Sequence, residues 1–149
     1  MQWTKFQISG AKVDSKTINE IFELQIKNAK IIRQTGYKER IAKIKSIVHW
    51  IYSNRDNIKN ALREDFLKPD IEADITEVWV AVDFAKNAIK NLKDWMAPKR
   101  VPSSLAVLLS KSYIEYYPKG VCLIIAPWNY PFQLCVVPLI YSIAAGNCC

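Results

Sequence analysis

Residues 120–147 contain no charged side chain, in a chain of which 23% is charged. A stretch of that length could cross a membrane as a single helix. However, Pro127 and Pro131 would break the middle of such a span, because proline within a bilayer needs partner helices to satisfy the freed carbonyl groups. We therefore interpret the stretch as a strand at 121–125, a loop between two prolines, and a helix over about residues 132–145, all buried in a domain.

The prolines and glycine of this stretch suit those elements. Pro131 fits a first helical turn, where its missing N–H would have no partner, and Gly146 fits the C-terminal end. Pro138 would lie inside the helix and kink it, at a cost of about 3 kcal/mol unless it is relieved locally. The run 121–125 is apolar on both faces, which is typical of a strand covered by helices on both sides of a sheet.

The chain before residue 97 shows the periodicity of amphipathic helices. Thr17-Ile-Asn-Glu20 has the form of a capping box and predicts the first helix start, and Gly36 predicts its stop. Breaks at 53–56 and at Lys68-Pro-Asp70 then give four helices with short joints. Each apolar stripe is expected in the core. In chain order, the stripes comprise Ile18, Ile21, Phe22, Ala29 and Ile32; Ile41, Ile44, Ile47, Val48 and Ile51; Ile58, Ala61, Leu62 and Phe66; and Ile75, Val78, Trp79, Val82, Ala85, Ile89, Leu92 and Met96.

The charged residues between these stripes are expected on solvated faces. They include the basic residues Lys38, Arg40, Lys43 and Lys45 and the acidic residues Glu64, Asp65, Asp74 and Glu77. The lone histidine, His49, is expected to be packed or exposed, not catalytic. The net charge of +7 is dispersed, which favours a solvated surface over a nucleic-acid interface.

The composition changes near residue 110. Residues 98–110 hold prolines and serines that forbid a continuing helix, so we interpret them as a linker. Residues 112–117 predict a strand, Pro118-Lys-Gly120 a turn, and 121–125 the returning strand of a hairpin. The fold class is therefore predicted to be α/β. Its parts are a helical layer, the linker, and a hairpin, loop and helix, at residues 1–97, 98–110 and 111–149.

The cysteines, at positions 122, 135, 148 and 149, lie in apolar surroundings without C-x-x-C spacing. With only His49 to supplement them, no zinc site is expected. A disulfide framework is not expected either, because the cysteines are few and gathered at one end, so we predict a reduced, cytoplasmic location. The N-terminus has no apolar core of the signal-peptide type, and we expect no export.

A strand, loop and helix in this order build ligand sites at the carboxyl ends of parallel strands. In the loop, Asn129 lies between Trp128 and Tyr130, with prolines on both outer sides, so a restricted backbone could aim its side chain. An amide is a neutral hydrogen-bond donor that suits an oxyanion hole. An asparagine in a turn is more commonly only a turn residue, and the loop chemistry leaves both interpretations open.

P-x-G-V from Pro118, P-W-N-Y-P at 127–131 and A-A-G-N at 144–147 form one longer pattern. This pattern resembles the N-terminal part of the aldehyde dehydrogenase superfamily, and its W-N-Y-P form resembles the class-3 branch. Segments 62–69 and 91–98 resemble the same branch, so the likeness runs from about residue 17 to the end. The resemblance implies a Rossmann-like cofactor-binding domain, NAD or NADP as cofactor, an aldehyde substrate and a homodimer of the complete protein.

Residue by residue, the resemblance implies that the Asn129 amide stabilises the oxyanion of a thiohemiacetal. Tyr130 would lie at the wall of the aldehyde tunnel, with Leu134 and, less strongly, Val137 facing the same tunnel. The cofactor site would be lined by Ile125, Ala126, Pro127 and Trp128.

The family's nucleophilic cysteine and glutamate base belong far downstream, and none of these four cysteines matches the nucleophile. Cys148 and Cys149 lie where the next strand should begin, so we interpret them as buried strand residues. The chain alone is expected to be an inactive N-terminal fragment of an enzyme that oxidises aldehydes to acids. The alternative is a non-catalytic helical interaction module whose apolar C-terminal tail, flanked by Lys111 and Lys119, inserts in a membrane.

Overall fold

The computed structural model describes residues 15–107 and 109–149 of the chain. Its helices are α1 (Ser15–Ile32), α2 (Tyr37–Ser53), α3 (Arg55–Phe66), α4 (Asp70–Ala73), α5 (Val80–Trp95) and α6 (Pro131–Ala145). A π-helical segment, η1 (Asp74–Trp79), joins α4 to α5, and a short 3-10 helix, η2 (Leu105–Val107), follows the first of two strands, β1 (Lys99–Val101) and β2 (Ser112–Ile114).

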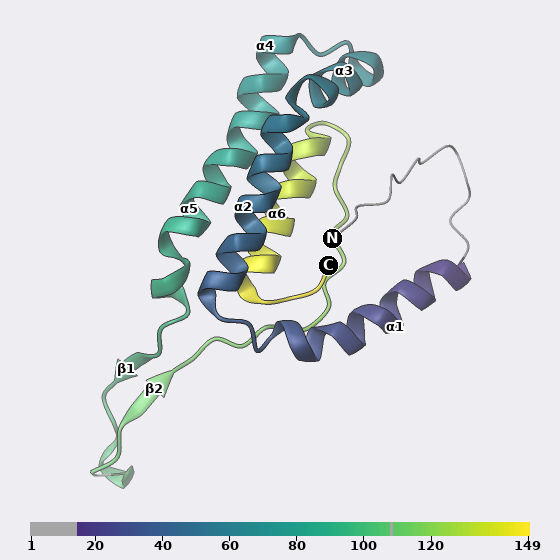
Figure 1. Cartoon of the computed structure of the whole chain (residues 1–149). Coiled ribbons are helices and arrows are strands. Elements are labelled where there is room, and N and C mark those ends of the chain that lie inside the picture. Colours follow the sequence, from purple (N-terminus) through teal and green to yellow (C-terminus); the bar gives the residue numbers. More distant parts are fainter. Residues whose placement is uncertain (1–14, 108) are drawn as a thin grey trace.

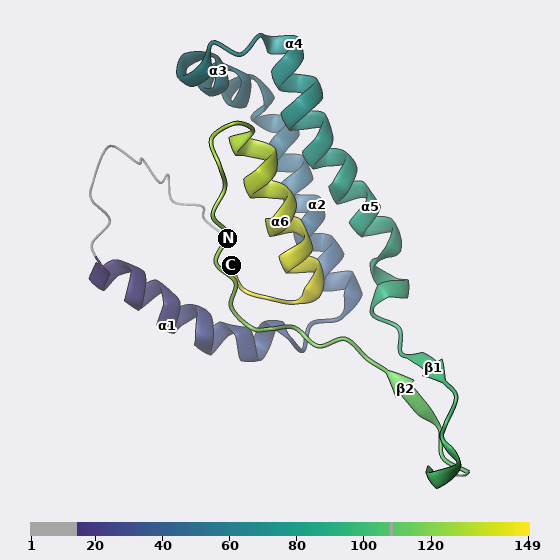
Figure 2. The same ribbon diagram turned by 180° about the vertical axis from the view of Figure 1, so that it is seen from behind.

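The core lies between α2, α5 and α6, which run side by side (Figures 1 and 2). Ile44 and Ile51 of α2 and Ile140 of α6 are fully buried, and Leu92 of α5 lies beside them. Burying a side chain of this size contributes about 1.5–3 kcal/mol. The apolar composition of α6 is therefore explained by its packing on two other helices of the same chain.

The helix predicted in the uncharged stretch, over about residues 132–145, is confirmed as α6. Pro131 occupies the first position of α6, Pro138 lies within it, and Gly146 ends it with a left-handed φ of 87°. Pro138 is exposed, so the kink-prone position faces away from the core. Among the described residues, no helix is both long enough and apolar enough to cross a membrane.

Helix α1 forms as predicted, but its apolar stripe is exposed. Ile18, Ile21 and Phe22 are 55%, 47% and 49% exposed, whereas Ala29 is buried. In Figure 1, α1 extends away from the α2, α5 and α6 layer, and the exposed fractions above show that this layer leaves most of its apolar stripe uncovered. The helix also includes Ser15, so Thr17 lies in its first turn and not at its cap. Periodicity specifies an amphipathic helix but not the partner of its apolar face.

Segments α4, η1 and α5 make one continuous helix from Asp70 to Trp95. Val78 and Val82 are buried as predicted, but Ile75 and Trp79 are 58% and 63% exposed, while Glu77 is fully buried. The π-helical turn explains this, because it holds one more residue per hydrogen-bonded turn than an α-helix. The helix face before Val80 is therefore rotated relative to a strict α-helical repeat.

The predicted pairing of residues 112–117 with 121–125 is wrong. Strand β2 instead pairs antiparallel with β1, with Lys99 opposite Ile114 and Val101 opposite Ser112. The turn between them is closed by Ser103 Oγ, which donates to the Ser110 carbonyl at 2.9 Å. Strand β1 and helix η2 thus lie within the segment interpreted as a linker, and the division into three parts stays a prediction.

The chain after Gly120 pairs with the C-terminal residues in parallel. Val121 forms a parallel bridge with Cys148, with 2.8 Å hydrogen bonds from Cys122 N–H to the Cys148 carbonyl and from Cys148 N–H to the Gly120 carbonyl. In the expected strand 121–125, pairing occurs only at its start, where Cys148 supplies the backbone partners. Cys148 is buried, as predicted, whereas Cys149 is exposed, which corrects the prediction for that residue.

Candidate functional site

The loop before α6 lies at the carboxyl end of this parallel pair. In open α/β sheets, ligands bind in the crevice outside the carboxyl ends of the strands. Of the residues predicted to line a cofactor site, Ile125 and Trp128 are 83% and 79% exposed, Pro127 is exposed and Ala126 is half-buried. The segment therefore presents an apolar surface that suits the flat faces of a dinucleotide.

Asn129 is exposed in the bend that leads into α6. Its side-chain amide makes no hydrogen bond to any described residue, whereas its backbone carbonyl accepts a 3.4 Å bond from Lys68 Nζ. The backbone is therefore held while the amide stays available to a ligand. An oxyanion donor needs this combination, because preorganised donors stabilise developing charge without reorganising.

Tyr130 and Leu134 lie at the start of α6. Tyr130 is half-buried and precedes the first helical residue, and its carbonyl accepts the Leu134 N–H at 3.0 Å. The ammonium of Lys68 lies 4.4 Å from the centre of the Tyr130 ring, within the range of a cation–π contact. Val137, the weaker tunnel candidate, packs against the core cluster that includes Ile51.

Two buried residues beneath this loop were missed by the sequence interpretation. Glu77, expected on a solvated face, is fully buried, and Lys68 is 8% exposed. One Glu77 oxygen accepts from Lys68 Nζ at 2.7 Å, and the other accepts from the backbone N–H of Gln133 at 2.9 Å. A signal was present: Glu77 lies four residues from Ala73 and from Ala81, in a line of small buried residues.

Arg40 bonds to the backbone at the C-terminal end of α6, as Glu77 does at the N-terminal end. It was expected on a solvated face, but it is 5% exposed. Its guanidinium donates to the carbonyls of Ala144 at 3.0 Å and Arg33 at 3.2 Å, and to Thr35 Oγ1 at 3.2 Å. Burial lowers the pKa of Arg40, with nearby Glu39 acting in the opposite sense. The helix ends in carbonyl groups that lack an intrahelical partner, and Arg40 satisfies one of them.

The Gly146-Asn147 pair connects this helix end to the strand before the loop. Asn147 is buried, and its side-chain oxygen accepts the backbone N–H of Gly120 at 2.8 Å. This bond joins the A-A-G-N and P-x-G-V segments, which lie far apart in the sequence. The two motifs therefore hold both ends of the strand, loop and helix unit.

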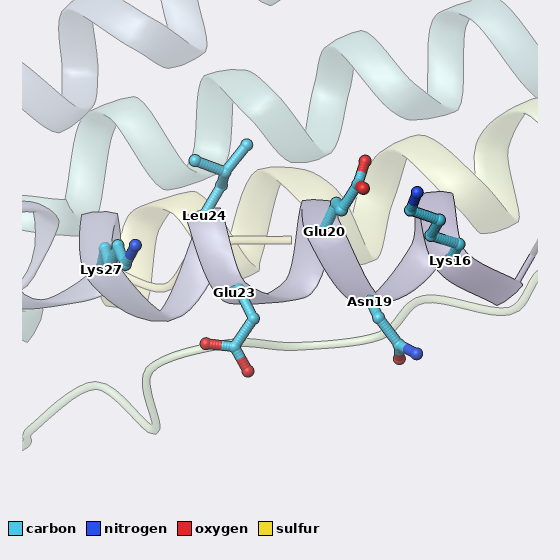
Figure 3. Close-up of a pocket in the computed structure, with 6 residues that line it drawn as sticks. All are labelled: Lys16, Asn19, Glu20, Glu23, Leu24 and Lys27. Carbon is cyan, nitrogen blue, oxygen red and sulfur yellow. The ribbon is translucent and has the colours of Figure 1, made fainter.

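A hollow on α1 shares no residue with the loop. Figure 3 shows its six lining residues, Lys16, Asn19, Glu20, Glu23, Leu24 and Lys27, all on that helix. A hollow lined by the described residues of one helix has no opposing wall to enclose a ligand. We place the candidate site at the loop before α6 because the residues with predicted roles in binding and catalysis lie there.

Comparison with known proteins identifies the family of the chain. Residues 5–149 match the model of the aldehyde dehydrogenase family. The chain belongs to this family. Among curated aldehyde dehydrogenases, mouse aldehyde dehydrogenase family 3 member B1 is 38% identical over 109 residues, which cover 73% of this chain and 23% of the relative. The putative aldehyde dehydrogenase AldX of Bacillus subtilis (strain 168) is 38% identical over 130 residues, covering 87% of this chain and 29% of the relative.

A solved aldehyde dehydrogenase structure shares the fold. The chain described as "Substrate bound state of Staphylococcus Aureus AldH" matches with a TM-score of 0.83 and 38% identity, over 87% of this chain and 28% of that one. The chain therefore spans about a quarter of the length of the aldehyde dehydrogenases it matches. The α/β class and the class-3-like resemblance are both confirmed.

Proposed function

We propose that the protein to which these residues belong oxidises an aldehyde to a carboxylic acid with NAD or NADP. The observation that carries the proposal is the Asn129 amide, exposed on a loop whose backbone is bonded to a buried lysine. In this role, the amide N–H donates to the carbonyl oxygen of the aldehyde as a thiolate attacks and negative charge develops there. Tyr130 and Leu134 line the aldehyde side of the loop.

The residues on the strand side of the loop suit a nicotinamide cofactor. Ile125, Ala126, Pro127 and Trp128 would hold it by apolar and backbone contact. When bound, the cofactor supplies the two-electron oxidant for the aldehyde. The homodimer and the cytoplasmic location are proposed from the class-3 likeness and the cysteine pattern.

The thiolate and the general base are proposed to come from residues outside these 149. Burial raises the pKa of the Cys148 thiol, with Lys43 acting in the opposite sense, and a raised thiol pKa disfavours the reactive thiolate. Because none of the four cysteines matches the nucleophile of the family, the 149-residue chain alone should show no aldehyde-dependent reduction of the cofactor. The membrane-tail alternative has no support from α6, which packs its buried residues against α2 and α5.

The test is Asn129→Ala in the complete protein, measured by steady-state kinetics and cofactor titration. Loss of one oxyanion donor lowers kcat by about 10²- to 10³-fold, and cofactor affinity should change little. Asn60→Ala, at an exposed position of α3, is the matched control and should behave as wild type. Near-normal turnover of Asn129→Ala would contradict the assigned role.

A further inference from the structure

The buried Lys68 and Glu77 pair links three segments of the chain at the candidate site. Glu77 lies in η1, Lys68 in the joint after α3, and their contacts reach the loop residues 129–130 and the first turn of α6. We propose that Lys68 and Glu77 are positioning residues, which hold the Asn129 backbone so that its amide points at the reacting oxygen. This inference rests on the proposed function.

Glu77 holds the helix side of the loop. The first N–H groups of a helix have no intrahelical partner, and α6 has neither an acidic residue in its first turn nor a side-chain cap of its own. The Glu77 carboxylate accepts the Gln133 N–H from a separate helix. A negative charge at this end is also favoured by the helix dipole. The direction in which α6 starts, directly after Asn129 and Tyr130, is thereby tied to η1.

Lys68 holds the loop side. Its ammonium donates to Glu77 Oε1 at 2.7 Å and to the Asn129 carbonyl at 3.4 Å, and lies 4.4 Å from the Tyr130 ring centre. The last two contacts lie on the two residues that share one peptide bond. Together they fix the peptide that joins Asn129 to Tyr130, and with it the position of the Asn129 Cα from which the side chain projects. Lys68 therefore helps to fix the point on the loop from which the amide reaches a ligand.

The backbone around the pair departs from regular helix on both sides. Leu67, directly before Lys68, has a left-handed φ of 53° and leaves its side chain 84% exposed. Glu77 lies in the π-helical turn. Strained residues and π-helical turns concentrate at functional sites, where the strain is retained because a particular geometry is needed. Leu67 takes this conformation as the C-cap of α3, and Lys68 follows it directly, while the π-helical turn contains the buried Glu77.

Stability alone does not account for the pair. Removing both charges from water carries a desolvation penalty that can exceed their attraction, and apolar replacements of similar size are often as stable. The pair makes its remaining contacts on the loop and on α6, not within the core. Its position is therefore better explained by what it holds than by the energy of the ion pair.

The test uses the complete enzyme with Lys68→Met combined with Glu77→Gln. The double change leaves no unpaired buried charge, and the glutamine oxygen can still accept the Gln133 N–H. We expect kcat to fall roughly tenfold or more, because small misplacements of catalytic groups cost up to about 10²-fold. The KM for the cofactor and the thermal midpoint should stay near wild type. Hydrogen exchange across residues 128–136, measured by mass spectrometry, should become faster.

Lys59→Met is the matched control. Lys59 also forms an ion pair, 2.9 Å from Asp56, but has no contact with the loop among the described residues. Both kcat and hydrogen exchange across residues 128–136 should therefore stay at wild-type values. A folded double variant with normal kcat, or with unchanged exchange across residues 128–136, would overturn the inference. If the wild-type enzyme proves inactive, or Asn129→Ala retains turnover, the proposed function fails, and the exchange measurement still decides whether the pair holds the loop.

Discussion

The two ends of α6 are held in the same way by residues of other elements. At the N-terminus, the Glu77 carboxylate accepts a backbone N–H, and at the C-terminus, the Arg40 guanidinium donates to a backbone carbonyl. Each charge opposes the partial charge that the helix dipole places there. Helix α6 has no charged residue of its own, so both charges must come from neighbouring helices.

The difference between the ends lies in what else each charge touches. Arg40 binds carbonyls and one hydroxyl in the turn after α1 and at the end of α6, none of them in the candidate loop. Glu77 is paired with Lys68, which reaches the Asn129 carbonyl. We infer that the C-terminal contact mainly stabilises the fold, while the N-terminal contact mainly orients the loop. Changes at the two ends should therefore have different effects.

The largest effect on stability is expected for Gly146→Ala. A Cβ at this position would lie 2.5 Å from the Arg40 guanidinium, and the φ of 87° is strained for alanine. Strain of about 1–2 kcal/mol and weakened Arg40 hydrogen bonds together predict a loss of about 3 kcal/mol in the free energy of unfolding, measured with urea. Gly36→Ala, where the Cβ meets only Glu39 Oε2 at 4.0 Å, should lose no more than about 1 kcal/mol. Equal losses in the two variants would contradict the proposed packing.

A somewhat smaller loss is expected for Arg40→Met. It removes the guanidinium bond to the Ala144 carbonyl, for an expected loss of about 2 kcal/mol in the same urea experiment. In this background, Gly146→Ala should cost about 1 kcal/mol less than in wild type, because the methyl group no longer meets a guanidinium. Strict additivity of the two changes would show that Arg40 and Gly146 do not act together. Lys38→Met, at an exposed position, is the control.

The smallest expected effect is a difference in labelling rate between two cysteines, one in α6 and one just after it. Cys135, in the first half of α6, is exposed, whereas Cys148, just beyond its C-terminal end, is buried. Because burial also raises the pKa of the Cys148 thiol, iodoacetamide should label it roughly tenfold or more slowly than Cys135 in the 149-residue chain. Mass spectrometry of digested samples gives both rates. If Cys148 is labelled faster than Cys135, the segment after α6 leaves Cys148 accessible to solvent, which would contradict its burial.

Local chemistry made α6 and its boundaries predictable. Pro131 and Gly146 act through their own backbone preferences, so the helix start and stop could be recognised without knowledge of any neighbour. Asn129 could be proposed as a donor because prolines restrict the loop around it. The hairpin was not predictable in the same way, because strand pairing depends on a partner that lies elsewhere in the chain. Residues 112–114 pair with residues 99–101 and not with residues 121–125.

The sequence by itself determined where the helices run and that residues 126–130 form a loop between a strand start and α6, because those features follow from proline, glycine and helical periodicity. Only the tertiary structure decided which charged residues are buried. Arg40 and Glu77 look like surface residues along the chain, and the π-helical turn and the packing of α6 bring them against free backbone groups. The spacing of Glu77 from Ala73 and Ala81 hints at its burial. The backbone groups that Glu77 and Arg40 contact on α6 lie more than fifty positions away, and the local sequence does not specify them.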